Sequence, residues 1–271
     1  MRVHSVLPET LTAAVDAALS GVEHVPHADV VDMRAAELAA GDPEALALIG
    51  PFRSHAVSEA LEATAPVGLP LLAPVATWAG VTRSNEPCEG DPARHRGTVL
   101  RILARDTELA ARLAEDVRAA EQQAFVVAGR HEYGVQLDGQ LGFVGLPRVA
   151  AAEDADLIVL CGLAGHPEVA RAAELGLPVV AFDGVQGGAP IPDCSVMLPF
   201  TPDDDMGGTT AAARAATLIS EAVAGGARDR TALLSALRIA GPFDEHGDPV
   251  EPPVWLYRTG ADWSLSPDRP L

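Results

Sequence analysis

The chain has 271 residues, 48% of them hydrophobic, which is enough for one large domain or two smaller lobes. Its formal net charge of −19 argues against binding to a nucleic-acid backbone, which requires clustered cations. All 19 basic residues are arginine, so neither a Walker A lysine nor a lysine Schiff base is available. We therefore expect no nucleic-acid partner and no cofactor, and no residue spacing indicates a metal site.

The N-terminal segment does not have the pattern of a targeting signal. It has one early arginine, but Pro8, Glu9 and Asp16 interrupt any continuous apolar run. No run reaches the ~18 apolar residues of a spanning helix, so we expect no membrane insertion. As written, the sequence predicts a cytoplasmic protein, with an extracytoplasmic one as the alternative if a signal has been removed. Cys161 lies inside an apolar run and is expected to be a buried thiol.

Short strands and helices alternate from the start of the chain. The predicted elements up to residue 82 are a strand at Val3–Leu7, helices at Thr10–Leu19 and Met33–Ala40, a strand ending at Ile49, a helix at Ala56–Ala65 and a strand at Leu71–Val75. This alternation is typical of an α/β protein with parallel sheets.

Hydroxyl side chains follow two successive strands between residues 48 and 82. Ser54 comes after the first of these strands, and Ala76 and Thr77 come directly after the second. In an open parallel sheet, ligands bind outside the carboxyl ends of the strands. Ser54 and Thr77 are therefore candidates for holding a small carboxylate, with help from backbone N–H groups at the start of a helix. The alternative is a helix cap at Ser54 and a turn at Thr77.

The second half continues the pattern. The predicted elements are a strand at Thr98–Ala104, a helix at Thr107–Ala120, strands at Phe125–Ala128, Asp156–Cys161, Pro178–Phe182 and Cys194–Leu198, helices at Pro167–Leu175, Thr209–Ala224 and Arg228–Leu237, and a hairpin at Gly241–Tyr257. The tail from Ser264 is expected to be loose. His131, beside Glu132, is expected to lie in a surface turn, and no helix is predicted between residues 134 and 154.

The order of short motifs resembles the leucine/isoleucine/valine-binding family of type I periplasmic solute-binding proteins, the receptors of amino-acid ABC transporters. The motifs that carry this resemblance are Gly50-Pro51, Ser54, Gly68-Leu69-Pro70, Ala76-Thr77, Tyr133-Gly134 and Asp183-Gly184. The resemblance covers roughly residues 45 to 263. The chain departs from the family in its shorter N-terminal section and in a compressed segment after Tyr133.

The resemblance implies two Rossmann-like lobes with parallel sheets, joined by several crossings. The first lobe is expected at residues 1–120 plus 201–240, and the second at 121–200 plus 241–271. It also implies an interlobe cleft in which Ser54, Ala76 and Thr77 hold the ligand carboxylate, Tyr133 lines the wall, and Asp183 receives the ammonium group. For Tyr133 and Asp183, a half-buried aromatic and a turn residue remain alternatives.

The function implied is non-catalytic binding of a small amino-acid-like ligand, with an ABC permease as the partner. Two alternatives stay open: a cytoplasmic sensor acting on a regulatory partner protein, and an enzyme that reuses the scaffold. The sequence contains no G-x-S-x-G, H-E-x-x-H or strand-following G-x-G-x-x-G motif. A Ser54–His55 nucleophile pair is disfavoured, because adjacent residues rarely point at each other.

Overall fold

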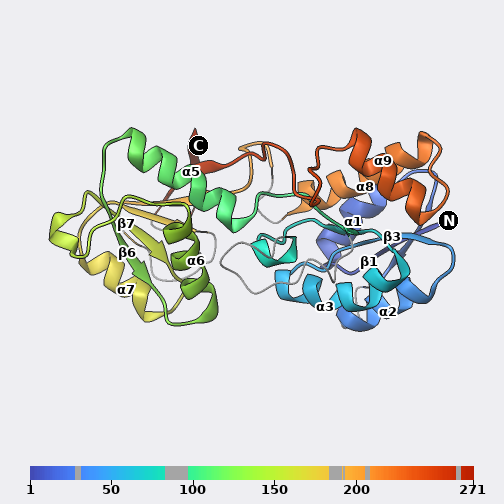
Figure 1. Cartoon of the computed structure of the whole chain (residues 1–271), viewed down its shortest axis with the longest axis horizontal. Helices are drawn as coiled ribbons and strands as arrows, with labels where there is room; N and C mark the ends of the chain where they lie inside the picture. Colours follow the sequence, from blue (N-terminus) through green and yellow to red (C-terminus); the bar gives the residue numbers. More distant parts are fainter. Residues whose placement is uncertain (28–31, 83–96, 183–190, 192, 205–207, 261–263) are drawn as a thin grey trace. The chain divides into compact units, whose positions relative to one another are not determined.

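The chain forms two α/β units, each built on its own sheet (Figure 1). The computed structural model describes all residues except 28–31, 83–96, 183–190, 192, 205–207 and 261–263. Unit 1 contains the described residues of Met1–Asn85, Glu89–Arg105 and Asp203–Pro252, and unit 2 contains those of Asp106–Pro202 and Pro253–Leu271. The expected α/β architecture with parallel strand pairing in two separate sheets is confirmed, since β4 and β8 lie in different sheets.

Unit 1 is a doubly wound parallel sheet. Its strands are β1 (Arg2–Ser5), β2 (Glu23–Pro26), β3 (Ala45–Ile49), β4 (Leu71–Ala73) and β5 (Val99–Arg101), in the order β2-β1-β3-β4-β5. Its helices are α1 (Glu9–Ala18), α2 (Asp32–Gly41), α3 (Ser54–Thr64), α8 (Thr209–Ala224) and α9 (Arg230–Ala240), with short 3₁₀ turns at Ala65–Val67 and Ala79–Val81. Figure 1 shows α2 and α3 below this sheet, with α8 and α9 above it.

The centre of unit 1 is apolar on both faces of the sheet. All five residues of β3 are buried, as expected for a parallel strand that has helices on both sides. β4 ends two residues earlier than predicted, because Pro74 has no N–H with which to continue the ladder.

Unit 2 is a mixed six-stranded sheet in the order β11-β10-β9-β8-β7-β6. Its strands are β6 (Ala124–Ala128), β7 (Leu157–Cys161), β8 (Val179–Phe182), β9 (Cys194–Leu198), β10 (Trp255–Thr259) and β11 (Leu265–Pro270), and its helices are α5 (Asp106–Ala119), α6 (Glu132–Phe143) and α7 (Pro167–Glu174), with a 3₁₀ turn at Ala152–Asp154. β6 to β9 pair in parallel, and β10 and β11 add antiparallel strands. Cys161 is fully buried, as expected.

Three predictions for unit 2 are wrong. The C-terminal tail is not loose, because β11 pairs with β10, and its prolines are tolerated on an edge strand. The expected hairpin at Gly241–Tyr257 is not one unit: Phe243 makes an antiparallel bridge with Pro249, whereas β10 pairs with β9 and β11. The segment after His131 is the helix α6, which packs on β6 and β7.

The boundaries of the two units follow their packing. The expected first lobe extends to residue 120, whereas α5 packs beside α6 in unit 2 (Figure 1). Residues 241–252 group with unit 1, because the carbonyl of Gly247 and the side chain of Asp248 hydrogen-bond to Arg101 of β5.

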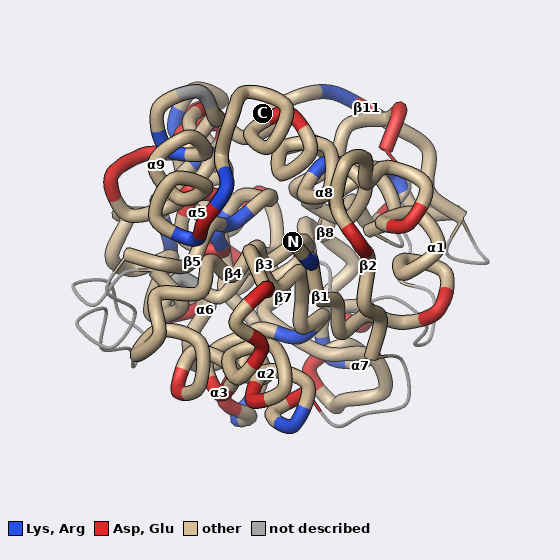
Figure 2. The backbone as a smooth tube through the Cα atoms, turned by 90° about the vertical axis from the view of Figure 1, so that its right-hand side faces the viewer, with Lys and Arg blue, Asp and Glu red and all other residues tan. Residues whose placement is uncertain are grey.

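Acidic positions are spread over the described elements, with arginines between them. Figure 2 shows red segments on α2 and α3 of unit 1, and on α2 Arg34 pairs with Glu37. No described element presents a continuous basic face of the kind that phosphate backbones require. No helix among the described residues is both long enough and apolar enough to cross a bilayer.

Candidate functional site

In the sheet of unit 1, the direction in which successive strands are added reverses between β1 and β3. From β1 the chain passes to β2 on one side, whereas β3, β4 and β5 follow on the other. Such a switch point opens a crevice at the carboxyl ends of the strands, where open α/β sheets bind ligands. At this place the backbones are close, since a Cβ on Gly50 would lie 2.4 Å from the carbonyl oxygen of Val6. The segment after β3, which leads into α3, therefore borders the switch point.

Ser54 connects this segment to the loop after β4. It is the first residue of α3, and the helix cap is Arg53, which makes no side-chain cap hydrogen bond. The Ser54 Oγ instead accepts a hydrogen bond from the backbone N–H of Trp78 at 3.3 Å. The capping alternative for Ser54 is therefore wrong, and the structure brings Ser54 beside the segment that holds Ala76 and Thr77.

Thr77 and Ala76 differ in what they offer. Thr77 is half-buried, and its hydroxyl forms no hydrogen bond to another described residue. Ala76 is buried, and its carbonyl accepts a hydrogen bond from the Arg101 guanidinium at 2.7 Å. Thr77 thus offers a hydroxyl that no other described residue engages, while the Ala76 carbonyl helps to fix the loop.

Arg101 organises the loop that carries Thr77. Its side chain is fully buried, and it donates to the carbonyl oxygens of Ala76 and Trp78, on either side of Thr77. It also forms an ion pair with Asp248, which is 2% exposed, at 3.1 Å. Arg101 therefore supports one wall of the candidate site.

The predicted residues of unit 2 are only partly described. Tyr133 is half-buried in the first turn of α6, and its ring stacks on His131 with centroids 6.4 Å apart. Asp183 lies outside the described residues. Ser54, Ala76 and Thr77 are therefore brought together in unit 1, and Tyr133 lies at the carboxyl edge of the sheet of unit 2.

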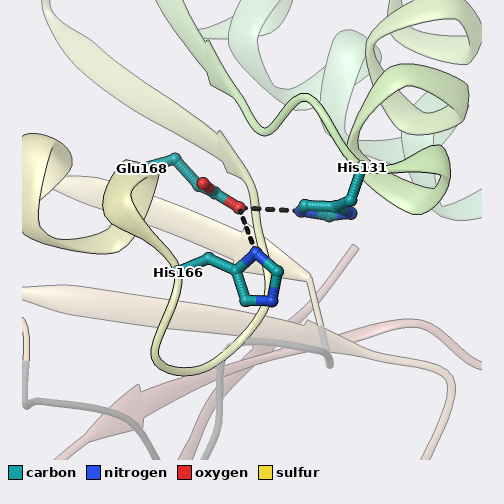
Figure 3. Close-up of side chains that lie close together, drawn as sticks. All are labelled: His131, His166 and Glu168. Carbon is teal, nitrogen blue, oxygen red and sulfur yellow. Dashed lines mark hydrogen bonds and ion pairs between the residues drawn. The ribbon is translucent and has the colours of Figure 1, made fainter.

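The same edge of unit 2 holds a cluster that the sequence did not indicate (Figure 3). The His131 Nε2 donates to the Glu168 Oε1 at 2.7 Å, and the His166 Nδ1 lies 3.9 Å from that oxygen. His131 follows β6, whereas His166 and Glu168 follow β7, so their proximity depends on the pairing of those strands. The prediction that His131 belongs to a surface turn is wrong: it caps α6, where its Nδ1 accepts from the Gly134 N–H.

Glu168 is ionised at neutral pH. It is 8% exposed, and burial alone would raise its pKa. The backbone N–H of Glu168 itself, the His131 ring and the backbone N–H of Leu163 outweigh that cost, so that its pKa lies below the ordinary value. This edge therefore presents a carboxylate between two imidazoles.

A serine–histidine–aspartate line also occurs in unit 1. The Ser5 Oγ lies 2.8 Å from the His24 Nε2, and the His24 Nδ1 lies 3.2 Å from the Asp16 Oδ1. Ser5 has no exposed surface, so no substrate can reach its hydroxyl, and the line is structural. His55 pairs with Glu59 at 3.2 Å, so the Ser54–His55 pair does not form.

A second pair of histidines lies beside this line. The His4 Nδ1 is 2.9 Å from the His27 Nε2, and the His4 Nε2 is 3.0 Å from the Asp42 Oδ2. Which ring nitrogen donates in each of these contacts depends on the tautomers of the two rings. Burial lowers the pKa of His27, and repulsion from His4 and His24 adds to this.

We expect the free energy of unfolding of unit 1 to fall as the solution is acidified from about pH 7 to about pH 5. The folded pKa of His27 lies below its ordinary value of 6.5, so the unfolded chain takes up the proton first. This stability is fully present above 6.5 and is lost as the pH falls toward the folded value. Urea unfolding at both pH values measures the slope, which His27→Gln should reduce and His55→Gln, at an exposed position, should leave unchanged.

The fold defines a class: it is that of the type I periplasmic-binding proteins. No known family profile matches the sequence, and no curated protein matches it. Among solved structures, the chain is similar to an ABC transporter substrate-binding protein from Desulfitobacterium hafniense, with TM-score 0.79, 18% identity and coverage of 99% of both chains.

Two further structures show the range of proteins that share this fold. A branched-chain amino acid transporter substrate-binding protein from Streptococcus pneumoniae, in complex with isoleucine, has TM-score 0.72 and 15% identity, over 100% of this chain and 99% of that one. A solute-binding protein from R. palustris, in complex with benzoate, has TM-score 0.68 and 15% identity, over 99% and 95%. At these identities, the likeness establishes the fold.

Proposed function

We propose that this protein binds a small carboxylate-bearing molecule, an amino acid or an analogue, without performing chemistry on it. The hydrogen bond between the Ser54 Oγ and the Trp78 N–H carries this proposal. It brings two hydroxyls, those of Ser54 and Thr77, to one carboxyl edge of the sheet, next to the switch point. The site residues proposed in unit 1 are Ser54, Ala76 and Thr77.

The start of α3 suits an anion. The first turn of α3 contains no acidic residue, whereas that of α1 begins with Glu9. N–H groups in the first turn of a helix lack intrahelical partners, and the helix dipole favours negative charge there. Together with the Ser54 and Thr77 hydroxyls, they provide the charge-assisted hydrogen bonds that a carboxylate needs.

The ligands of the similar structures most directly support the proposal that the site binds a carboxylate group. Isoleucine in the Streptococcus pneumoniae protein and benzoate in the R. palustris protein share a carboxylate, whereas only isoleucine carries an ammonium group. We propose the amino-acid class because the sequence motifs point to it, with Tyr133 and Asp183 as further ligand contacts. An ABC permease is the proposed partner, and an extracytoplasmic location is proposed with it.

Calorimetry with the twenty amino acids, benzoate and a deaminated analogue of the best ligand tests this function. Heat of binding with an amino acid and no product formed supports non-catalytic recognition. Equal affinity for an amino acid and its deaminated analogue would mean that the site recognises the carboxylate and not the ammonium group. The absence of binding by every compound in the panel would overturn it.

Replacing Thr77 with valine should weaken the ligand by about 1.5–3 kcal/mol, which corresponds to roughly ten- to a hundredfold in Kd. The substitution keeps the shape of the side chain and removes its hydroxyl donor. Titration calorimetry on the folded variant measures the change. Thr217→Val, at an exposed position on α8, is the matched control and should bind as the parent does. An unchanged Kd in Thr77→Val would remove Thr77 from the site.

A further inference from the structure

Three side chains in unit 2 place their potential ligand atoms close together. Those of His131, His166 and Glu168 all lie within 4.8 Å of one another. The rings of His131 and His166 meet edge to face, with centroids 4.9 Å apart, and the carboxylate lies between them (Figure 3). Among the described residues, this is the one such group of three potential metal ligands.

The backbone leaves room for these side chains. Gly129 follows β6, and a Cβ there would lie 2.3 Å from the His131 Nε2 and 2.4 Å from the Glu168 Oε1. Gly162 follows β7, and a Cβ there would lie 2.7 Å from the Glu168 Cγ. A side chain at either position would displace the cluster. Both strands that lead to the cluster are thus followed by glycine, which leaves space for the side chains of the cluster.

We propose that His131, His166 and Glu168 bind one divalent first-row transition-metal ion of the class that favours imidazole, with Zn²⁺ as the representative. Two imidazoles and one carboxylate form a three-ligand set known for zinc, and they leave a coordination position open to water or to a ligand. No metal site is expected from the sequence, since His131 and His166 lie 35 positions apart.

The geometry needs only local adjustment. Zinc bonds of about 2.0–2.2 Å place tetrahedral ligand atoms roughly 3.3–3.6 Å apart. The His131–Glu168 distance of 2.7 Å must open slightly, and the His166–Glu168 distance of 3.9 Å must close slightly. The side chain of His166 is 46% exposed, so it can rotate toward the ion without repacking the core.

Metal binding has a defined cost at His131. The ion takes the place of the proton that the Nε2 donates to Glu168, and this proton moves to the Nδ1, so that the ring stays a neutral imidazole. A proton on the Nδ1 ends the hydrogen bond from the Gly134 N–H that caps α6. We therefore expect moderate affinity and a loosened first turn of α6 in the metal-bound protein.

Titration of the full chain with ZnCl₂, without any organic ligand, tests the proposal. We expect one ion per chain and no comparable binding of MgCl₂, which prefers oxygen ligands. His166→Ala removes an exposed ligand and should weaken Zn²⁺ binding at least about tenfold, as should Glu168→Gln. His55→Ala removes a histidine of unit 1 that is 78% exposed, and it should bind as the parent does.

The outcomes separate this proposal from the proposed function. An unchanged Zn²⁺ affinity in His166→Ala would overturn the site, as would the absence of a one-to-one isotherm in the parent. Because His166 is exposed, we expect His166→Ala to remain folded, and circular dichroism of the variant checks this. X-ray absorption of the zinc-loaded chain should show nitrogen and oxygen ligands, and a sulfur ligand would also overturn the assignment. Amino-acid binding through Ser54 and Thr77 is measured separately and does not depend on this result.

Discussion

Replacing Arg101 with methionine is expected to lower the free energy of unfolding by about 3–5 kcal/mol, the range for breaking a buried ion pair. The methionine side chain keeps much of the volume but removes every donor. Asp248, 2% exposed, then loses its ion pair with Arg101, while Arg105 still reaches its other oxygen at 3.1 Å. The carbonyls of Ala76 and Trp78 lose their donors in the same step.

Urea unfolding followed by tryptophan fluorescence measures this change. Arg34→Met is the matched control, because Arg34 is exposed and, among the described residues, its ion pair is with Glu37, three positions further along α2. It should change the stability by less than about 0.5 kcal/mol, as surface ion pairs contribute little. Arg101→Lys should also destabilise unit 1, since an ammonium cannot reproduce the planar fork that contacts both carbonyls and Asp248. Equal stability of Arg101→Met and Arg34→Met would contradict this role.

The same residue connects stability to the proposed function. Arg101 holds the backbone on both sides of Thr77, while Ser54 accepts from the Trp78 N–H. The loop therefore keeps its shape without a ligand. We expect Arg101→Lys to weaken ligand binding even where the variant is folded, because the loop that carries Thr77 loses its fixed geometry.

Strands were the most predictable part of the fold. A short, wholly apolar run such as β3 or β7 has few alternatives in a chain of alternating strands and helices, and both lie where the sequence indicates. Ser54 and Thr77 were predictable as neighbours for the same reason, since each follows a strand and adjacent parallel strands end at one edge.

Features that depend on contacts between distant residues were not predictable. Helix α6 contains three glycines, which are poor helix formers, and its existence depends on packing against β6 and β7. The contact between His131 and Glu168 joins residues 37 positions apart through the β6–β7 pairing, and no local spacing signals it. A loose tail is the usual expectation at a chain end, but here the edge of β10 pairs with it.

Replacing either of two glycines of helix α6 with alanine should change the free energy of unfolding of unit 2, in opposite directions for the two positions. Gly134 lies in the first turn, and a Cβ there would lie 2.8 Å from the carbonyl oxygens of Cys161 and Gly129. Gly139 is exposed in the interior of the same helix. Gly139→Ala should stabilise unit 2 by about 0.5–1 kcal/mol, since alanine is the better helix former.

Gly134→Ala should instead destabilise unit 2 by about 1–3 kcal/mol, the usual cost of overpacking. The obstructing atoms are the backbone carbonyl oxygens of Gly129, which follows β6, and Cys161, the last residue of β7. Backbone atoms cannot rotate away as a side chain can. The helix must therefore move outward, and the cap from the Gly134 N–H to the His131 Nδ1 lengthens with it. Urea unfolding of both variants measures the two signs. A stabilised Gly134→Ala would show that α6 does not lie as close to β6 and β7 as the structure places it, and would weaken the case for a cluster built on His131.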